Sequence, residues 1–138
     1  MKSFTIIPHI ADVRLHIKGN TLQELFLAGM EGMAQISKKD FCKAFKTFPQ
    51  EHSVSINAQD VTSLLIDFLS EVLTHSHVER AIFCKADFSE LSPTALRAKI
   101  FGAKTNHFDE DIKAVTYHEA QVKKNKRGLY ETTIVLDI

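Results

Sequence analysis

The chain has 138 residues, of which 44% are hydrophobic and 25% charged, and its 17 basic residues are balanced by 17 acidic ones. This length and composition are typical of a soluble globular protein, and we predict one domain over residues 1–138. The zero net charge argues against a stand-alone nucleic-acid binder, and no run approaches the roughly 20 apolar residues that span a bilayer.

The N-terminal segment predicts two short strands. The first covers Phe4 to Ile7 and is interrupted by Pro8. In the second, apolar and polar residues alternate over 13–18, which is the period of a half-buried strand. Gly19-Asn20 then gives a turn signal that ends this strand.

The first helix is predicted to begin at a capping box formed by Thr21 and Glu24. Apolar residues continue at helical spacing as far as Ile36, which gives a helix of about four turns. Residues 37–50 mix Lys with Phe and Pro and are interpreted as a surface connection.

The rest of the chain predicts one more helix among several strands. Residues 52–58 form a short strand, and Asp60 is placed to cap a helix over 61–73 whose apolar residues form a broad stripe. Later residues alternate with a period of two in four segments, with 123–128 as a hairpin loop between the last two; the segments are 80–88, 95–103, 112–122 and 130–138. This order predicts an α+β fold: an antiparallel or mixed sheet with two amphipathic helices packed on one face.

The two cysteines, Cys42 and Cys84, are far apart in sequence and form no CxxC motif. The first residues also lack an apolar segment long enough for a secretory signal. We therefore expect a cytoplasmic protein in which both cysteines are reduced thiols.

Two carboxylates lie in strand-like surroundings, Asp12 and Asp137. If the first and last strands are neighbours, both side chains and the terminal carboxylate of Ile138 converge. Such hard oxygen ligands suit Ca²⁺, Mg²⁺ or Mn²⁺. The alternative is that Asp12 is a turn residue and Asp137 a solvated charge at a sheet edge.

Three further residues are candidate functional contacts: His9, Lys113 and His118. Each could contact a phosphate, and either histidine could act as acid or base, although each could equally be an ordinary surface residue. The pair His75 and His77 lacks a third ligand at a familiar spacing and is interpreted as a solvated helix end. No Walker loop, GxSxG elbow, HExxH motif or dinucleotide glycine fingerprint is present in the sequence.

Four segments in register resemble the archease family: PHIADVR, DVTSLLIDFLSEVL, IKAVTYH and the final IVLDI. The first of these is typically HTADVG in the family, so that Ile10 and Arg14 depart from the pattern. Many members also carry Glu where Ala103 follows Gly102 here.

The resemblance implies a sheet with two packed helices and an accessory role for an RtcB-type RNA ligase, which seals RNA ends in tRNA splicing and RNA repair. Archeases help this ligase through its guanylylated histidine intermediate, with GTP and a divalent metal, and support repeated turnover. The resemblance also implies that Asp12, Asp137 and Ile138 bind a divalent cation, often calcium. The protein would then be a ligase cofactor and not itself an enzyme, with RNA contacted only through the ligase.

Two alternatives remain open from the residues alone. One is a stand-alone metal-dependent hydrolase of a phosphorylated small molecule, with Asp12 and Asp137 as ligands and His118 as acid or base. The other is an RNA-binding module, although balanced charge and the absence of an aromatic-plus-basic stripe argue against it.

Overall fold

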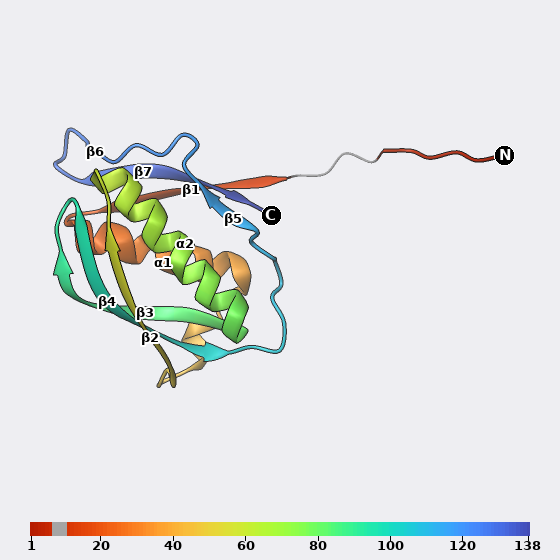
Figure 1. The fold of residues 1–138 in the computed structure, drawn as a ribbon, viewed down its shortest axis with the longest axis horizontal. Helices are drawn as coiled ribbons and strands as arrows, with labels where there is room; N and C mark the ends of the chain where they lie inside the picture. Colours follow the sequence, from red (N-terminus) through yellow and green to blue (C-terminus); the bar gives the residue numbers. More distant parts are fainter. Residues whose placement is uncertain (7–10) are drawn as a thin grey trace.

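The computed structural model describes residues 1–6 and 11–138 (Figure 1). Its elements follow in chain order: β1 (Asp12–Gly19), α1 (Leu22–Ser37), the short 3₁₀ helix η1 (Cys42–Ala44), β2 (Gln50–Asn57), α2 (Val61–Glu79), β3 (Ala81–Leu91), β4 (Ala95–Lys104), β5 (Ala114–Thr116), β6 (Lys123–Lys124) and β7 (Tyr130–Asp137). The predicted α+β class is confirmed.

The strands form two sheets, where the sequence predicted one. In the first, β7 lies between β1 and β5 and also pairs with β6; in the second, β4 lies between β2 and β3. All of these pairs are antiparallel. Both helices lie between the two sheets (Figure 1), with α1 in contact with β1 and β3 and α2 in contact with β2, β3 and β5.

The two helices begin where their capping residues predict. The Thr21 hydroxyl accepts a hydrogen bond from the Glu24 backbone N–H, and the Asp60 carboxylate accepts one from the Ser63 N–H at 2.8 Å. These bonds satisfy N–H groups that have no partner within the helix. Helix α2 continues to Glu79, beyond the predicted end at residue 73. The prediction ended too early because the last turns carry polar residues that interrupt the apolar stripe.

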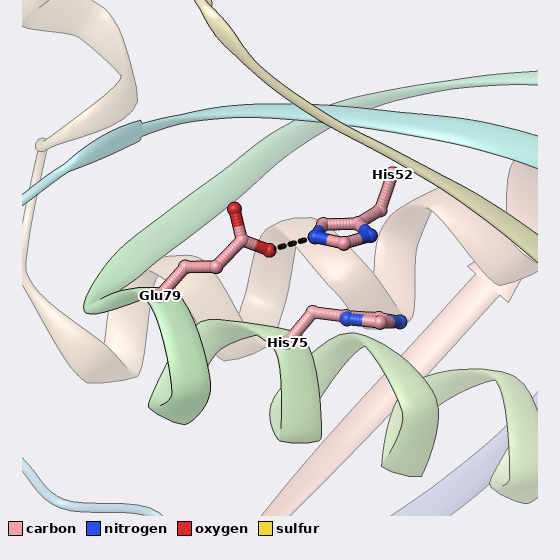
Figure 2. A group of neighbouring side chains, drawn as sticks. All are labelled: His52, His75 and Glu79. Carbon is pink, nitrogen blue, oxygen red and sulfur yellow. Dashed lines mark ion pairs between the residues drawn. The ribbon is translucent and has the colours of Figure 1, made fainter.

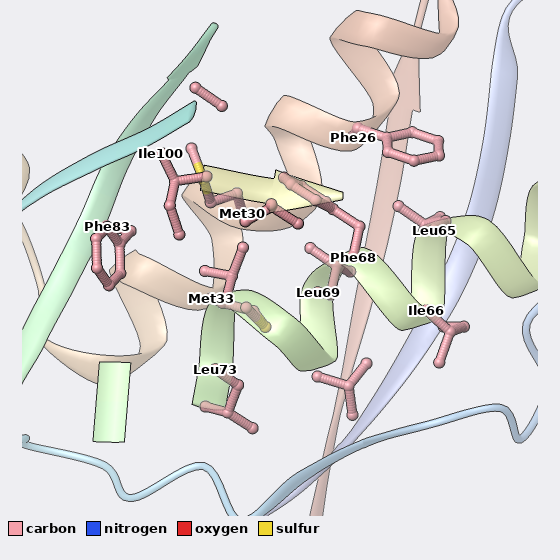
Figure 3. Close-up of a cluster of buried hydrophobic side chains, with 14 of the residues drawn as sticks. Phe26, Met30, Met33, Leu65, Ile66, Phe68, Leu69, Leu73, Phe83 and Ile100 are labelled. Atoms are coloured by element: carbon pink, nitrogen blue, oxygen red, sulfur yellow. The ribbon is translucent and has the colours of Figure 1, made fainter. Parts of the chain in front are cut away.

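The core is continuous from one sheet to the other. Figure 3 shows how the side chains of α1 and α2 fill the space between the sheets. The largest fully buried side chains are Phe26, Phe68, Phe83, Leu25, Met30, Leu64, Leu65, Ile66, Leu69, Ile82, Leu96 and Ile100. Since both sheets cover the helices, burial on more than one face explains their broad apolar stripes.

Two strand predictions are wrong in extent. Residues 4–6 form no strand, and Ile7 and Pro8 lie outside the described residues. The segment 112–122 forms only the three-residue β5, because Ala114–Thr116 pair with the end of β7 while β6 pairs with its beginning.

The chain between β5 and β6 is held by other contacts. The Gln121 N–H bonds to the Thr132 hydroxyl on β7, and the Val122 N–H bonds to the Thr62 hydroxyl on α2. A continuous ladder along β7 is therefore replaced by a loop tied to both β7 and α2.

The expectation of two reduced cysteines is also wrong. Cys42 of η1 and Cys84 of β3 form a disulfide with their Cα atoms 5.7 Å apart. Their separation of 42 residues gives no local signal, since only the packing of η1 on β3 brings them together. Among the described residues, no helix combines the length and apolar character needed to cross a membrane.

Candidate functional site

The first and last strands of the chain bring two carboxylates face to face. In the antiparallel ladder of β1 and β7, Asp12 is the direct partner of Asp137. Directly paired residues project to the same face with Cβ atoms about 4.5–5.5 Å apart. Two like charges at this spacing repel each other, so the pair favours a cation between or beside them.

The backbone at this end of β7 is held from both sides. The Lys113 N–H donates to the Asp137 carbonyl at 2.8 Å, and the Ile138 N–H donates to the Ala11 carbonyl at 3.1 Å. Asp137 is exposed, and among the described residues no side chain forms an ion pair with its carboxylate. The strand therefore fixes the main chain of Asp137, and its carboxylate is available to a ligand.

Arg14 is the cation closest to this pair in the described structure. Its guanidinium lies 3.4 Å from an Asp12 carboxylate oxygen and 2.8 Å from one of Glu119, in the turn after β5. All three side chains are partly exposed to solvent. Arg14 thus compensates part of the Asp12 charge and competes with any metal ion for that carboxylate.

Lys113 and His118 do not lie in one strand, although the sequence predicted that they would. Lys113 precedes β5 with an exposed side chain, and it contacts Asp137 through its backbone. His118 is exposed in a turn, beside the Glu119 that reaches Arg14, and is not in a strand as predicted. His9 lies outside the described residues.

A known protein family matches nearly the whole chain, including the strands that carry Asp12 and Asp137. The model of the archease protein family matches residues 4–138. The chain belongs to this family. It is 28% identical over 145 residues to the protein archease of Methanosarcina mazei, covering 99% of this chain and 97% of that one. It is 27% identical over 151 residues to the protein archease of Pyrococcus abyssi, covering both chains completely.

Solved structures support the archease fold. The crystal structure of an archease and possible chaperone from Thermotoga maritima matches with a TM-score of 0.69 and 15% identity, covering 100% of this chain and 99% of that one. The solution structure of Methanobacterium thermoautotrophicum protein 1598 matches with a TM-score of 0.73 and 24% identity, covering 96% of each chain. These identities carry the fold alone.

The position of Ala103 bears on the departure from the archease pattern. Ala103 is buried on β4 in a small apolar cluster with Ala34, Phe41 and Ile82. It belongs to the sheet that does not contain Asp12 and Asp137. A carboxylate at this position would be buried among apolar side chains, at a substantial cost in stability.

A second group of side chains was missed by the sequence reading. His52, His75 and Glu79 bring one potential ligand atom each to within 4.8 Å of one another (Figure 2). The sequence predicted that His75 belongs to a solvated helix end, because no third metal ligand lies at a familiar spacing from His75 and His77. The spacing of His75 and Glu79, one helical turn apart, was a readable signal, whereas His52 joins them only through the packing of β2 on α2.

Proposed function

We propose that this archease is an accessory protein of an RtcB-type RNA ligase. It promotes the GTP-dependent guanylylation of the ligase and its multiple turnover in tRNA splicing or RNA repair. Its contribution depends on a divalent-cation site formed by the carboxylates of Asp12 and Asp137 and the terminal carboxylate of Ile138. Family membership over residues 4–138 supports the partner, and the site residues are those that the family resemblance implies.

The observation that carries the site is the direct pairing of Asp12 with Asp137 in the β1–β7 ladder. Two carboxylates directly opposite each other, one of them without an ion-pair partner among the described residues, lower the stability of the sheet, because like charges at this spacing repel each other. They are a suitable choice for holding Ca²⁺, Mg²⁺ or Mn²⁺, which take carboxylate and carbonyl oxygens as ligands. Such an ion would supply positive charge near transferring phosphate groups.

The residues around the pair have supporting tasks. The backbone bonds of Lys113 and Ile138 hold the end of β7 against both neighbouring segments, which fixes the main chain that carries the Asp137 carboxylate. The exposed ammonium of Lys113 and the imidazole of His118 are available to contact phosphate oxygens or the partner protein. His9 is proposed as a further contact from the family motif alone.

Calorimetric titration with CaCl₂ and MnCl₂ tests the site. The unaltered protein should bind one ion, and Asp137→Asn should abolish binding while the circular dichroism spectrum stays unchanged. Asp87→Asn is the matched control, because Asp87 is an exposed strand aspartate on the other sheet. Equal binding by Asp137→Asn and the unaltered protein would refute the site.

A reconstituted reaction tests the partner. Adding this protein to an RtcB-type ligase, GTP, Mn²⁺ and RNA should speed ligase guanylylation and allow each ligase molecule to seal several RNAs. The Asp12→Asn/Asp137→Asn double variant should lose most of this effect, and Asp87→Asn should retain it. If the unaltered protein changes neither rate nor turnover, the proposed accessory function is wrong.

A further inference from the structure

The group His52, His75 and Glu79 lies away from the Asp12–Asp137 pair. His52 is on β2, an edge strand of the sheet that contains β3 and β4, whereas Asp12 and Asp137 belong to the other sheet. His75 and Glu79 are one turn apart near the end of α2, so that both project to the same side of the helix. Figure 2 shows their side chains directed toward His52 in the space between α2 and β2.

The three side chains are in close contact. The Nε2 atom of His52 forms an ion pair with a carboxylate oxygen of Glu79. The rings of His52 and His75 are stacked, with centroids 4.0 Å apart and planes inclined by 18°. All three residues are partly buried, which limits competition from water for their donor atoms.

Two polar atoms of this group are poorly satisfied. Within residues 1–6 and 11–138, the buried Nε2 of His75 forms no hydrogen bond, and the buried Oε2 of Glu79 meets Nε2 of His52 in an ion pair that lacks hydrogen-bond geometry. Buried polar atoms in native proteins are usually hydrogen-bonded, and an exception calls for an explanation such as a bound ion. A ligand that uses the Glu79 carboxylate would remove one of these deficits.

Glu71 offers a way to satisfy the other. Its carboxylate lies 3.3 Å from Nε2 of His75, one turn earlier on α2, although the direction is not that of a hydrogen bond. A rotation of the ring that turns Nε2–H toward Glu71 would leave Nδ1 as the metal donor. Metal-binding histidines commonly have their second nitrogen held by a carboxylate in this way.

We propose that His52, His75 and Glu79 bind a transition-metal ion of the zinc type. Two imidazoles and one carboxylate form a donor set that zinc takes in proteins, usually with water in a fourth position. Imidazole nitrogen favours Zn²⁺, Co²⁺ or Ni²⁺ over Ca²⁺ and Mg²⁺, which prefer oxygen. This site therefore differs from the Asp12–Asp137 pair in its metal as well as in its place.

Binding has a structural consequence. The ion would join the edge strand β2 to the last turns of α2, and the stacked rings would rotate apart so that one nitrogen of each faces the ion. His52, the most exposed of the three side chains, has the space for this rotation. Because the three residues come together only in the folded chain, metal binding should raise the unfolding temperature.

The test uses protein stripped with a chelator and titrated with ZnCl₂ and CoCl₂. We expect one Zn²⁺ per chain in calorimetry, a higher unfolding temperature with Zn²⁺, and the intense visible absorption of four-coordinate Co²⁺. His75→Gln and Glu79→Gln should weaken Zn²⁺ binding by about tenfold or more. Because changes on α2 can impair folding, His52→Gln on the edge strand provides a second variant with the same expected loss.

Two controls separate this site from other binding. His107→Gln removes an exposed loop histidine beside Asp109 and should leave Zn²⁺ affinity unchanged. Asp137→Asn should also bind Zn²⁺ normally, so that failure of the proposed calcium site does not affect this result. No Zn²⁺ binding by the unaltered protein, or equal binding by folded His52→Gln, would overturn the proposal.

Discussion

Arg14 shows how one residue can set the strength of the proposed calcium site. Its guanidinium contacts Asp12 and Glu119, so that it occupies a carboxylate that a cation would need. Since the contact with Asp12 is partly exposed, it is worth no more than about 1 kcal/mol. Arg14→Ala should therefore tighten Ca²⁺ binding by about two- to fivefold, measured by calorimetry at low ionic strength.

Lys18→Ala is the control for this change. Lys18 lies on the same face of β1 as Arg14 but pairs with Glu131 at the far end of the ladder. Its loss removes the same unit of charge without freeing Asp12. An equal gain in both variants would mean that overall charge, and not the contact with Asp12, limits Ca²⁺ affinity.

Residue patterns alone identified Asp12 and Asp137 as a candidate pair but did not identify the group of His52, His75 and Glu79. Asp12 and Asp137 were identified because each interrupts a strand pattern, but their direct pairing depends on the β1–β7 register, which links opposite ends of the chain. The contact between His52 and α2 left no such pattern, because an exposed edge histidine looks the same with or without partners. His118 was assigned to a strand because Val115 and Tyr117 continue an alternation that the turn at Glu119, with φ of 63°, interrupts.

At the scale of elements, the cap of α2 predicts a dependence of stability on pH. The hydrogen bond from the Ser63 backbone N–H is the main cause that holds the pKa of Asp60 below its ordinary value. A lowered folded-state pKa stabilises the protein above the unfolded pKa, and this contribution is lost as pH falls through the folded pKa. Asp60→Asn should therefore unfold a few degrees lower than the unaltered protein at pH 7, and this gap should narrow as the pH falls below about 3.9, the ordinary pKa of an aspartate carboxyl.

Thermal unfolding at pH 7 and pH 3 measures this difference. Other carboxylates titrate equally in both proteins, so that their effects cancel in the comparison. Asp60→Ala, which also loses the hydrogen-bond acceptor, should remain less stable at low pH. A gap for Asp60→Asn that is the same at pH 7 and pH 3 would show that the charge of the cap contributes nothing.

The disulfide joins η1 to β3 and restricts the unfolded chain. Closing a loop of 42 residues is worth about 4 kcal/mol in the chain-entropy model. Cys42→Ser/Cys84→Ser should lower the free energy of unfolding by about this amount, measured with guanidinium chloride. Dithiothreitol should lower the stability of the unaltered protein to that of the double variant and leave the double variant unchanged. If the two proteins are equally stable without reductant, the disulfide assignment is wrong.

Element prediction succeeded where the signal was local. The capping residues and the apolar spacing of α1 and α2 act within a few residues, so that their starts were predicted correctly. The division into two sheets was not predictable from the alternation of apolar and polar residues, because this alternation does not indicate which strands pair with each other. The long segment from 105 to 113 crosses from β4 to β5 and changes sheets, and its irregular sequence gives no sign of this path.

In the described part of the chain, α1 and α2 are enclosed by two sheets (Figure 1). One candidate cation site lies on the sheet of β1 and β7, and the other lies between β2 and α2. The Asp12–Asp137 pair lies where β1, β5 and β7 meet, and the His52 group lies where β2 meets α2. Since the helices connect both regions through a continuous core, loss of core packing should affect the fold as one unit.

Truncation of Phe68 tests whether the two sheets and the helices unfold as one unit. It is completely buried on α2, with its ring centroid 5.8 Å from that of Phe26 on α1 and 5.7 Å from that of Phe88 on β3. Phe68→Ala leaves a cavity shared by these elements and should cost about 3–5 kcal/mol in unfolding free energy. Because the core is continuous, circular dichroism of the helices and near-ultraviolet absorption of the aromatic residues should report one coincident transition.

Val78→Ala on the same helix is the control, since Val78 is 77% exposed and its truncation should change stability by less than about 0.5 kcal/mol. Two separate transitions in Phe68→Ala would mean that the sheets unfold independently. In that case the two candidate cation sites would belong to separately stable parts of the chain, and Zn²⁺ would protect only the transition that includes β2 and the end of α2. A single transition shifted as a whole by Zn²⁺ is the result that one continuous core requires.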